Sequence, residues 1–207
     1  MRELSLHILD VVENGLAAGA SCIRVRIDED TGTDLLRIEI TDNGKGMDKE
    51  LIEKVFDPFY TTRKTRHVGL GLPLFREAAR RCDGDLILQS ETGKGTTVMS
   101  TFRLSHVDRA PLGDMPSALM AVLLSEHPVD LFYVHRIGSL KFELDTAEIR
   151  RELGDVPLCH PKIRDWLFRE LCEGEASLRP SAESVQRHGD SSRAEAGEQI
   201  VNTAPSR

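Results

Sequence analysis

Two short stretches in the N-terminal third combine residue types that suit nucleotide chemistry. The first is Asp42-Asn43-Gly44-Lys45-Gly46-Met47, which follows the alternating apolar run Leu36–Ile40. Apolar side chains at every second residue are typical of a half-buried strand. A carboxylate at the end of such a strand can accept a hydrogen bond from an exocyclic amine such as that of adenine. The neighbouring glycines let a flat ring approach the backbone. Asp-Asn-Gly is also an ordinary turn, so this stretch alone leaves both interpretations open.

The second stretch lies in residues 4–18, where a broad apolar face predicts a helix. Asp10 and Asn14 are four residues apart and share one side of that helix, with His7 a turn earlier. A carboxylate can orient or deprotonate a nucleophile. A single amide oxygen suits Mg²⁺, which accepts few protein ligands and keeps phosphate and water oxygens. The alternative is a polar helix face that meets only water.

Glycines recur at the predicted start of a later helix. Gly69-Leu70-Gly71-Leu72-Pro73 opens a helix that continues to about Arg81, with proline in the first turn. Glycines before a helix N-terminus leave backbone N–H groups free for phosphate oxygens, and the helix dipole adds to this attraction. The preceding basic segment, which contains Arg63 and Lys64, could close over the same phosphates or simply be solvated.

The remaining patterns predict paired strands and segregated helices. Strands are expected over residues 21–28, 35–41, 85–91 and 96–104, and a short helix is expected over 47–55. The turn at residues 92–95 is of the glycine type that joins a hairpin. This order predicts an α+β fold, a two-layer α/β sandwich, rather than a doubly wound sheet.

Composition narrows the class of partner. The chain has 207 residues and a net charge of -7, which argues against a nucleic-acid surface because such a surface requires a basic patch. No apolar run approaches about 18 residues, so we expect no membrane span. No leader is visible, and we therefore expect a cytoplasmic protein with reduced cysteines. A small ligand or another protein is the expected partner.

In their order along the chain, these stretches resemble the motifs of the GHKL superfamily, whose nucleotide-binding domain has the Bergerat fold. That superfamily contains sensor histidine kinases, type II topoisomerases, mismatch-repair ATPases and heat-shock chaperones. The segments that carry the resemblance are Asp10–Asn14 (N box), Asp42–Gly46 (first glycine box), Phe56–Phe59 with Thr61–Arg63 (F box of histidine kinases), Gly69–Leu72 (second glycine box) and Gly93–Thr97 (hydroxyl-bearing box).

The resemblance implies a mixed sheet covered on one face by three helices, with ATP between the helices under a lid at residues 61–68. It puts Asn14 at the Mg²⁺ position and Asp42 at the adenine position. Asp10 would orient or deprotonate the attacking group. The other residues that it implies in ATP binding are Gly44, Gly46, Met47, Phe59, Arg63, Lys64, Gly69, Leu70, Gly71, Leu72, Thr96 and Thr97.

Two departures from the family pattern bear on activity. Asp10 stands where the ATP-hydrolysing members have a glutamate, which is one methylene longer, so hydrolysis is left open. The domain begins at residue 1, so we expect no phosphoacceptor hairpin before it. His7 is expected to be a local polar residue on the nucleotide-facing side of its helix.

The expected function is therefore Mg²⁺-dependent phosphoryl transfer from ATP to a partner protein in signal transduction, as in kinases of the histidine-kinase type. An ATP-gated binding module with little or no catalysis, a weak ATPase and a serine kinase resembling anti-sigma factors are the alternatives. The F box at Phe56–Phe59 favours the histidine-kinase type over the serine kinase.

The chain divides into an ATP-binding domain at 1–105, a small α+β accessory unit at 106–175 and a disordered tail at 176–207. In the accessory unit, the patterns predict helices over 117–126 and 161–173 and a hairpin over 130–145. A helix cap is expected at 145–148, followed by a short helix over 149–153. Trp166 and Leu167 are expected on one apolar side of the last helix, and His135 is expected to be a packing or surface residue. A unit of this size should pack on the ATPase or on a partner.

Overall fold

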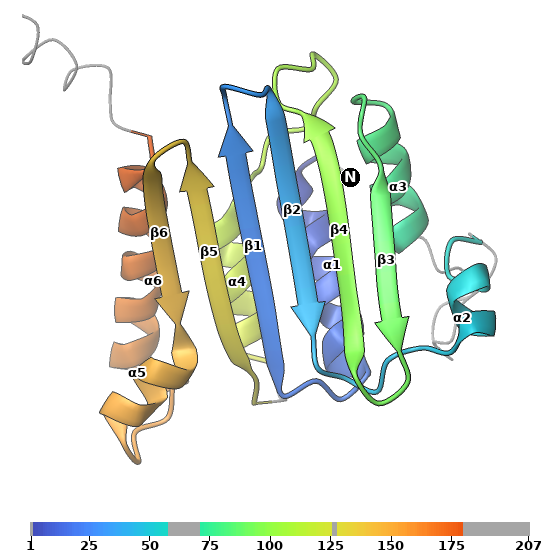
Figure 1. The fold of residues 1–207 in the computed structure, drawn as a ribbon. Helices are drawn as coiled ribbons and strands as arrows, with labels where there is room; N and C mark the ends of the chain where they lie inside the picture. The colour runs from blue at the N-terminus through green and yellow to red at the C-terminus, as the bar shows by residue number, and fades with distance from the viewer. Residues whose placement is uncertain (1, 58–70, 126–127, 180–207) are drawn as a thin grey trace, which may run out of the picture.

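The computed structural model describes residues 2–57, 71–125 and 128–179. Its centre is one six-stranded sheet in the order β3-β4-β2-β1-β5-β6 (Figure 1). Neighbouring strands are antiparallel except β1 and β5, which are parallel. The strands are β1 (Cys22–Asp30), β2 (Leu35–Asp42), β3 (Leu86–Glu91), β4 (Gly95–Arg103), β5 (Asp130–Ile137) and β6 (Leu140–Asp145).

Most of the helices lie on one side of this sheet (Figure 1). They are α1 (Leu4–Ala17), α2 (Lys49–Lys54), α3 (Gly71–Arg80), α4 (Met115–Leu123), α5 (Thr146–Leu153) and α6 (Pro161–Ser177). Helices α1, α3, α4 and α6 cover one face, while the opposite face is not covered by any described helix (Figure 1). The expected α+β two-layer sandwich is confirmed, although α6 adds to the helices that the family resemblance implied.

The core forms where strand alternation meets the helix layer. Ile23, Val25 and Ile27 of β1 are fully buried, as the every-second-residue pattern requires. Against them pack apolar residues of the helices, including Ile8 of α1 and Phe75 of α3. Burying one such side chain contributes about 1.5–3 kcal/mol. This packing fixes α1 against the sheet, and α1 carries the N-box residues.

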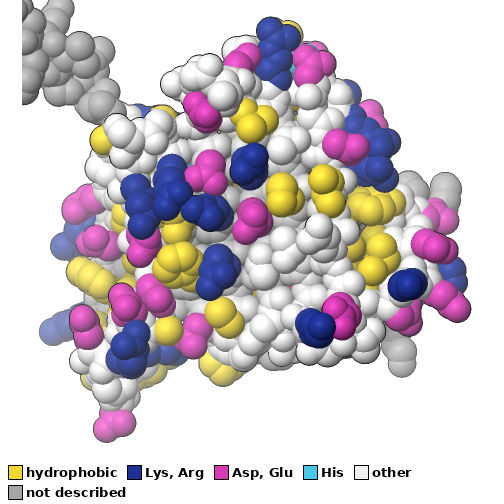
Figure 2. Space-filling view, in the orientation of Figure 1, with side chains coloured by type: hydrophobic (Ala, Val, Ile, Leu, Met, Phe, Trp, Pro, Cys, Tyr) yellow, Lys and Arg dark blue, Asp and Glu magenta, His cyan; other side chains and the backbone are white. Residues whose placement is uncertain are grey.

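The uncovered face of the sheet carries mixed charge. Figure 2 shows basic and acidic side chains side by side over the strands. A hollow of about 320 Å³ on this face is lined by Arg26, Arg37 and Arg136 together with three carboxylates and one leucine. Because the charges of the lining cancel, the hollow has no preference for an anion or a cation.

Residues 128–179 continue the sheet instead of forming a separate layer. Strand β5 pairs with β1 from Cys22↔Asp130 to Glu29↔Ile137, and β6 returns antiparallel to β5. Helix α4 connects the antiparallel part of the sheet to β5 and packs on α1 and α6. The accessory unit therefore packs on the N-terminal domain, one of the two placements that its small size predicted.

Two helix boundaries differ from the expected ones. Helix α4 begins at Met115 because the Asp114 side chain accepts a hydrogen bond from the Ser117 N–H at 3.0 Å and caps the helix there. Helix α6 continues to Ser177 and Leu178 is buried, so the prediction that the disordered tail starts at residue 176 is wrong at its first residues. Residues 180–207 lie outside the described residues.

Trp166 also differs from its expected position. It is 41% exposed, whereas Leu167 and Leu171 are buried. Successive helical residues point about 100° apart, so burial of Leu167 turns Trp166 toward solvent.

Candidate functional site

Asp42 is the last residue of β2, and the side chain of Asn43 fixes the loop that follows it. Asn43 Oδ1 accepts hydrogen bonds from the N–H groups of Ser21 and Cys22, both at 2.9 Å. The Gly44 N–H donates to Asp42 Oδ1 at 2.8 Å. These bonds attach the end of β2 to the beginning of β1 and hold the Asp42 carboxylate in one orientation.

The electrostatic state of Asp42 is unusual for an aspartate. Burial raises its pKa above the ordinary value, and hydrogen bonds from the backbone N–H groups of Gly44 and Thr96 oppose that shift only partly. Within the described residues, the groups that act on this carboxylate are backbone amides and no charged side chain. Asp42 is thus a partly desolvated acceptor whose charge is not neutralised by any side chain in the described ranges.

Helix α1 lies directly against this carboxylate at Gly15. A Cβ at Gly15 would lie 3.0 Å from Asp42 Cβ and 3.3 Å from Asp42 Oδ2. The loop after Asp42 is also close to α1, since the Lys45 N–H donates to the Ala18 carbonyl at 3.0 Å. Asn14 is exposed and directly precedes Gly15. The structure therefore brings the two positions on which the sequence hypothesis depends, Asp42 and Asn14, to the same end of α1.

Asp10 lies one turn earlier on α1, beside the beginning of α3. A Cβ at Gly71 would lie 3.5 Å from Asp10 Cβ and 3.5 Å from Asp10 Oδ2. Leu72, the next residue, is buried in the core. Helix α1 thus runs from the second glycine segment, at Asp10, to the first, at Gly15.

His7 does not lie where the helical spacing suggested. It is 3% exposed, and its ring stacks on Phe75 with centroids 5.0 Å apart and planes at 11°. Burial lowers the pKa of His7 to about 4, and its Nδ1 has no hydrogen-bond partner in the part of the chain that is described. Helix α3 covers that part of α1, so His7 is a buried residue and does not line an open surface.

The loop that follows Asp42 lies between α1 and the β3–β4 hairpin, and close contacts hold it against the hairpin. Gly46 has φ +66°, and a Cβ there would overlap the Glu91 carbonyl. The Met47 N–H donates to Ser90 Oγ at 2.9 Å, and Ser90 Oγ lies 2.9 Å from Thr96 Oγ1. These contacts bring Gly46, Met47 and Thr96 to the Asp42 end of the sheet.

Thr97 lies apart from the other members of its motif. Its Oγ1 is 3.1 Å from Thr41 Oγ1, so both hydroxyls point to the face of the sheet opposite α1. Alternation along β4 places its neighbour Val98 in the core. The structure does not bring the Thr97 side chain to Asp42.

Several expected site residues fall outside the described residues. They are Phe59, Arg63, Lys64, Gly69 and Leu70, together with the predicted lid at 61–68. Of the F box, Phe56 packs against the core, and the Arg76 guanidinium lies 4.6 Å from the centre of its ring.

Three residues contribute to the site although the sequence did not single them out. Gly15 permits the close approach of α1 to Asp42, Asn43 fixes the loop, and Ser90 joins the loop to β4. Gly15 had a detectable signal, because a glycine inside a helix costs about 1 kcal/mol relative to alanine and calls for a packing reason.

The donors on α1 fit a magnesium ion bound with a nucleotide. Asn14 offers an amide oxygen and Asp10 a carboxylate one turn away, and a hard cation prefers such oxygens. The described residues contain no group of three or more His, Cys, Asp and Glu side chains able to hold a metal. No helix in the described ranges is long and apolar enough to cross a membrane.

Comparisons with known proteins agree with this geometry. A family model described as histidine kinase-, DNA gyrase B-, and HSP90-like ATPase matches residues 2–106. The aerobic respiration control sensor protein ArcB of Escherichia coli (strain K12) is 28% identical over 137 residues, which are 61% of this chain and 17% of that protein. The sensor histidine kinase WalK of Bacillus subtilis (strain 168) is 41% identical over 85 residues, 39% of this chain and 14% of that protein.

Sporulation kinase C of Bacillus subtilis (strain 168) is 32% identical over 94 residues, 45% of this chain and 22% of that protein. The matched part of the chain thus spans less than a quarter of each of these relatives. A solved structure described as the N-terminal domain of a DNA repair protein covers 70% of this chain and 52% of its own, with 15% identity and a TM-score of 0.47.

Proposed function

Because this chain belongs to the family of histidine kinase-, DNA gyrase B- and HSP90-like ATPases, we propose that it binds ATP with Mg²⁺ and transfers the γ-phosphoryl group to a partner protein in signal transduction. The observation that carries the proposal is the contact of α1 at Gly15 with the half-buried Asp42 carboxylate. The contact supports the proposal because Asp42, the proposed adenine acceptor, lies against the residue that follows Asn14, the proposed Mg²⁺ ligand. The ArcB and WalK matches are sensor proteins by name, which favours a role in signalling.

The residues divide the work along α1. The Asp42 carboxylate accepts a hydrogen bond from the amine of adenine, and partial desolvation of the carboxylate strengthens that hydrogen bond. Asn14 contributes an oxygen to Mg²⁺, which neutralises phosphate charge when it is bound. Asp10, beside Gly71, orients the attacking group. The predicted phosphate contacts from Gly69, Arg63 and Lys64 belong to the same proposal. Catalysis of this kind depends on positioning and charge neutralisation, with little covalent chemistry by the protein.

An ATP-gated binding module is the second candidate function. The observation that favours it is the short side chain of Asp10, which reaches one methylene less far than the glutamate of the hydrolysing members. In such a module, nucleotide binding would change the surface offered to a partner protein, and little phosphate would be transferred or released.

Incubation with γ-labelled ATP separates these functions. The purified protein is incubated alone and with cell extract, and labelled proteins are tested for acid stability. Acid-labile label supports transfer to histidine or aspartate, and acid-stable label supports a serine kinase. The Asp42→Asn variant should lose labelling, while Glu39→Gln, a change on the same strand but on its other face, should retain it. Tight ATP binding without label or released phosphate would contradict transfer and leave the gated module.

A further inference from the structure

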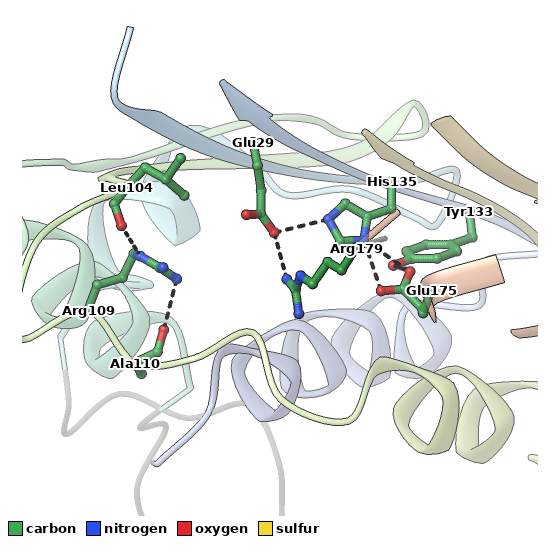
Figure 3. A network of polar contacts seen from close by, with 8 residues as sticks. All are labelled: Glu29, Leu104, Arg109, Ala110, Tyr133, His135, Glu175 and Arg179. Carbon is green, nitrogen blue, oxygen red and sulfur yellow. Dashed lines mark hydrogen bonds and ion pairs between the residues drawn. The ribbon is translucent and has the colours of Figure 1, made fainter. Parts of the chain in front are cut away.

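A second group of ionisable residues, most of them largely buried, lies at the other end of β1 (Figure 3). It consists of Glu29 on β1, Tyr133 and His135 on β5, Glu175 on α6 and Arg179 just after α6. We call these five residues the His135 clasp. Ile23 pairs with Asp42 at one end of β1, and Glu29 lies six residues further along, about 20 Å away at the spacing of a strand. The clasp is therefore remote from the proposed ATP site.

His135 is enclosed between two carboxylates. It is 0% exposed, whereas the Glu29 and Glu175 side chains are 13% and 15% exposed. Nδ1 lies 3.0 Å from both Glu175 oxygens, and Nε2 lies 3.2 Å from Glu29 Oε1. A neutral imidazole has one N–H and can donate to only one of these carboxylates. An imidazolium donates to both.

Two further side chains complete the charge balance. The Tyr133 hydroxyl donates to Glu175 Oε1 at 2.6 Å, and Arg179 donates to Glu29 Oε1 at 3.0 Å. With His135 protonated, two positive groups match two carboxylates. With His135 neutral, one negative charge is left without compensation in a largely buried place, which is costly.

The other elements around the clasp add little ionisable chemistry. Phe142 of β6 is the strand partner of His135 and contacts the Tyr133 ring edge-on, with centroids 6.1 Å apart. Lys141 and Glu143 of β6 pair with each other. Helix α4, which packs on α6, has no ionisable side chain between Met115 and Leu123. Glu29, Glu175 and Arg179 are thus the charged groups that face His135 from the described elements.

We propose that protonated His135 is a pH-sensitive clasp that holds the C-terminal end of α6 on the sheet, and that loss of its proton loosens residues 175–179. The inference goes beyond ATP binding, because it concerns the opposite end of β1 and stands whether or not phosphate is transferred. It also gives a function to the strand pair β5–β6: it places a histidine where β1 and α6 can both reach it.

The direction of the pH dependence follows from the pKa shifts. Burial alone would lower the pKa of His135, but the contacts with Glu175 and Glu29 outweigh burial and raise it above its ordinary value. The clasp is therefore complete below about pH 6.5 and is lost as the pH rises through the folded-state pKa. The hydrogen bond with His135 lowers the pKa of Glu29, so that side chain keeps its charge below its usual range and loses it only in stronger acid.

Hydrogen exchange of the full chain tests the clasp. Protection factors, corrected for intrinsic exchange, are measured for residues 171–179 between about pH 6 and pH 9. The wild type should lose on the order of tenfold in protection across this range. Glu175→Gln should show the loss at a lower pH, because one of the two carboxylates that raise the pKa of His135 is gone. His160→Gln, at the exposed N-terminal end of α6, serves as the matched control and should behave as wild type.

A direct titration decides the matter if a variant fails to fold. NMR of the labelled imidazole rings in the wild type should show one buried histidine that titrates above about pH 6.5, together with amide shifts in residues 175–179. Titration of His135 at or below that pH, or protection of α6 that does not change with pH, would overturn the proposal. ATP affinity of Glu175→Gln should equal that of wild type, so a failure here is distinct from a failure of the proposed function.

Discussion

Ionisable groups at the two ends of β1 differ in their partners and in the direction of their pKa shifts. Near one end, the described groups that act on the Asp42 carboxylate are backbone amides, and burial raises its pKa. At the other end, each carboxylate contacts a cation, and the pKa values of Glu29 and His135 move toward the charged forms. A carboxylate with no described cation beside it marks the end that we assign to ATP, and ion-paired groups mark the end that ties α6 to the sheet.

This difference assigns ligand binding to one end of the sheet and stabilisation of α6 to the other. An acid that is desolvated and not neutralised destabilises the protein, and a ligand that donates to it recovers part of that free energy. An acid paired with histidine and arginine has no such capacity left. Because the two ends are about 20 Å apart, substitutions at each should act independently. Four substitutions can break or sharpen this contrast.

The largest effect is expected at Gly95, next to Asp42 in the sheet. This residue has φ +99°, and a Cβ would overlap the Asp42 carbonyl oxygen. Gly95→Ala should lower the free energy of unfolding by about 4 kcal/mol because it forces the ends of β2 and β4 apart. Urea denaturation measures the change. Gly93→Ala is the control: its φ is +82° in open space, so it should cost only about 1–2 kcal/mol. Equal costs would mean that no close approach exists at Asp42.

The second largest effect is a loss of stability in acid that we expect from the buried His7. The folded state keeps this ring neutral to about pH 4, whereas the unfolded state protonates it below about 6.5. Stability should therefore fall by about 3 kcal/mol as the pH drops through that interval, and His7→Leu should remove this slope. Thermal unfolding at a series of pH values tests it. An unchanged slope in the variant would contradict an unpaired, neutral His7.

Asp42→Asn should weaken ATP binding by about 1–3 kcal/mol, since the variant replaces the adenine acceptor by an amide. Its free energy of unfolding should not fall, because the change removes a partly desolvated charge. Calorimetry and urea denaturation provide the two readouts. Glu39→Gln on the other face of β2 should leave ATP affinity as in wild type. A variant that loses stability and keeps its affinity would reverse the roles assigned to the two ends.

The smallest effect is expected at Tyr133. In contrast to Asp42→Asn, substitution there should lower stability and leave ATP affinity unchanged. Tyr133→Phe removes the hydroxyl that donates to Glu175 and should cost about 1.5 kcal/mol of stability, typical of a hydrogen bond to a charged group. ATP affinity should not change. Loss of affinity in this variant would show that the two ends are coupled.

The sequence predicted the parts of the fold that depend on local pattern. Alternation gave the strands, and helical spacing gave the helices, within a few residues. The pairing of β5 with β1 was not predictable, because a parallel partner distant in the sequence leaves no local mark. The same limit hid the His135 clasp, since Glu175 lies forty residues beyond His135 in a helix turn that composition predicted to end earlier.

The candidate site shows the same division. Asp42, Asn14 and Asp10 were proposed from residue type and spacing. In the structure, Asp42 lies against α1 at Gly15, and Asp10 of α1 lies against Gly71. His7 was misplaced because helical period fixes which residues share a side, but not which neighbour covers that side. Gly15 was missed because its role depends on the distance between α1 and β2, which only the packed structure supplies.

The most direct test of the ATP site is an NMR titration of the labelled protein with ATP and Mg²⁺. The account predicts that amide shifts concentrate in residues 10–15, 42–47 and 71–72, around the contact between Gly15 and Asp42. Residues of the His135 clasp should not shift. Saturable binding with no shifts in these segments, or with shifts centred on Glu29 and His135, would contradict it.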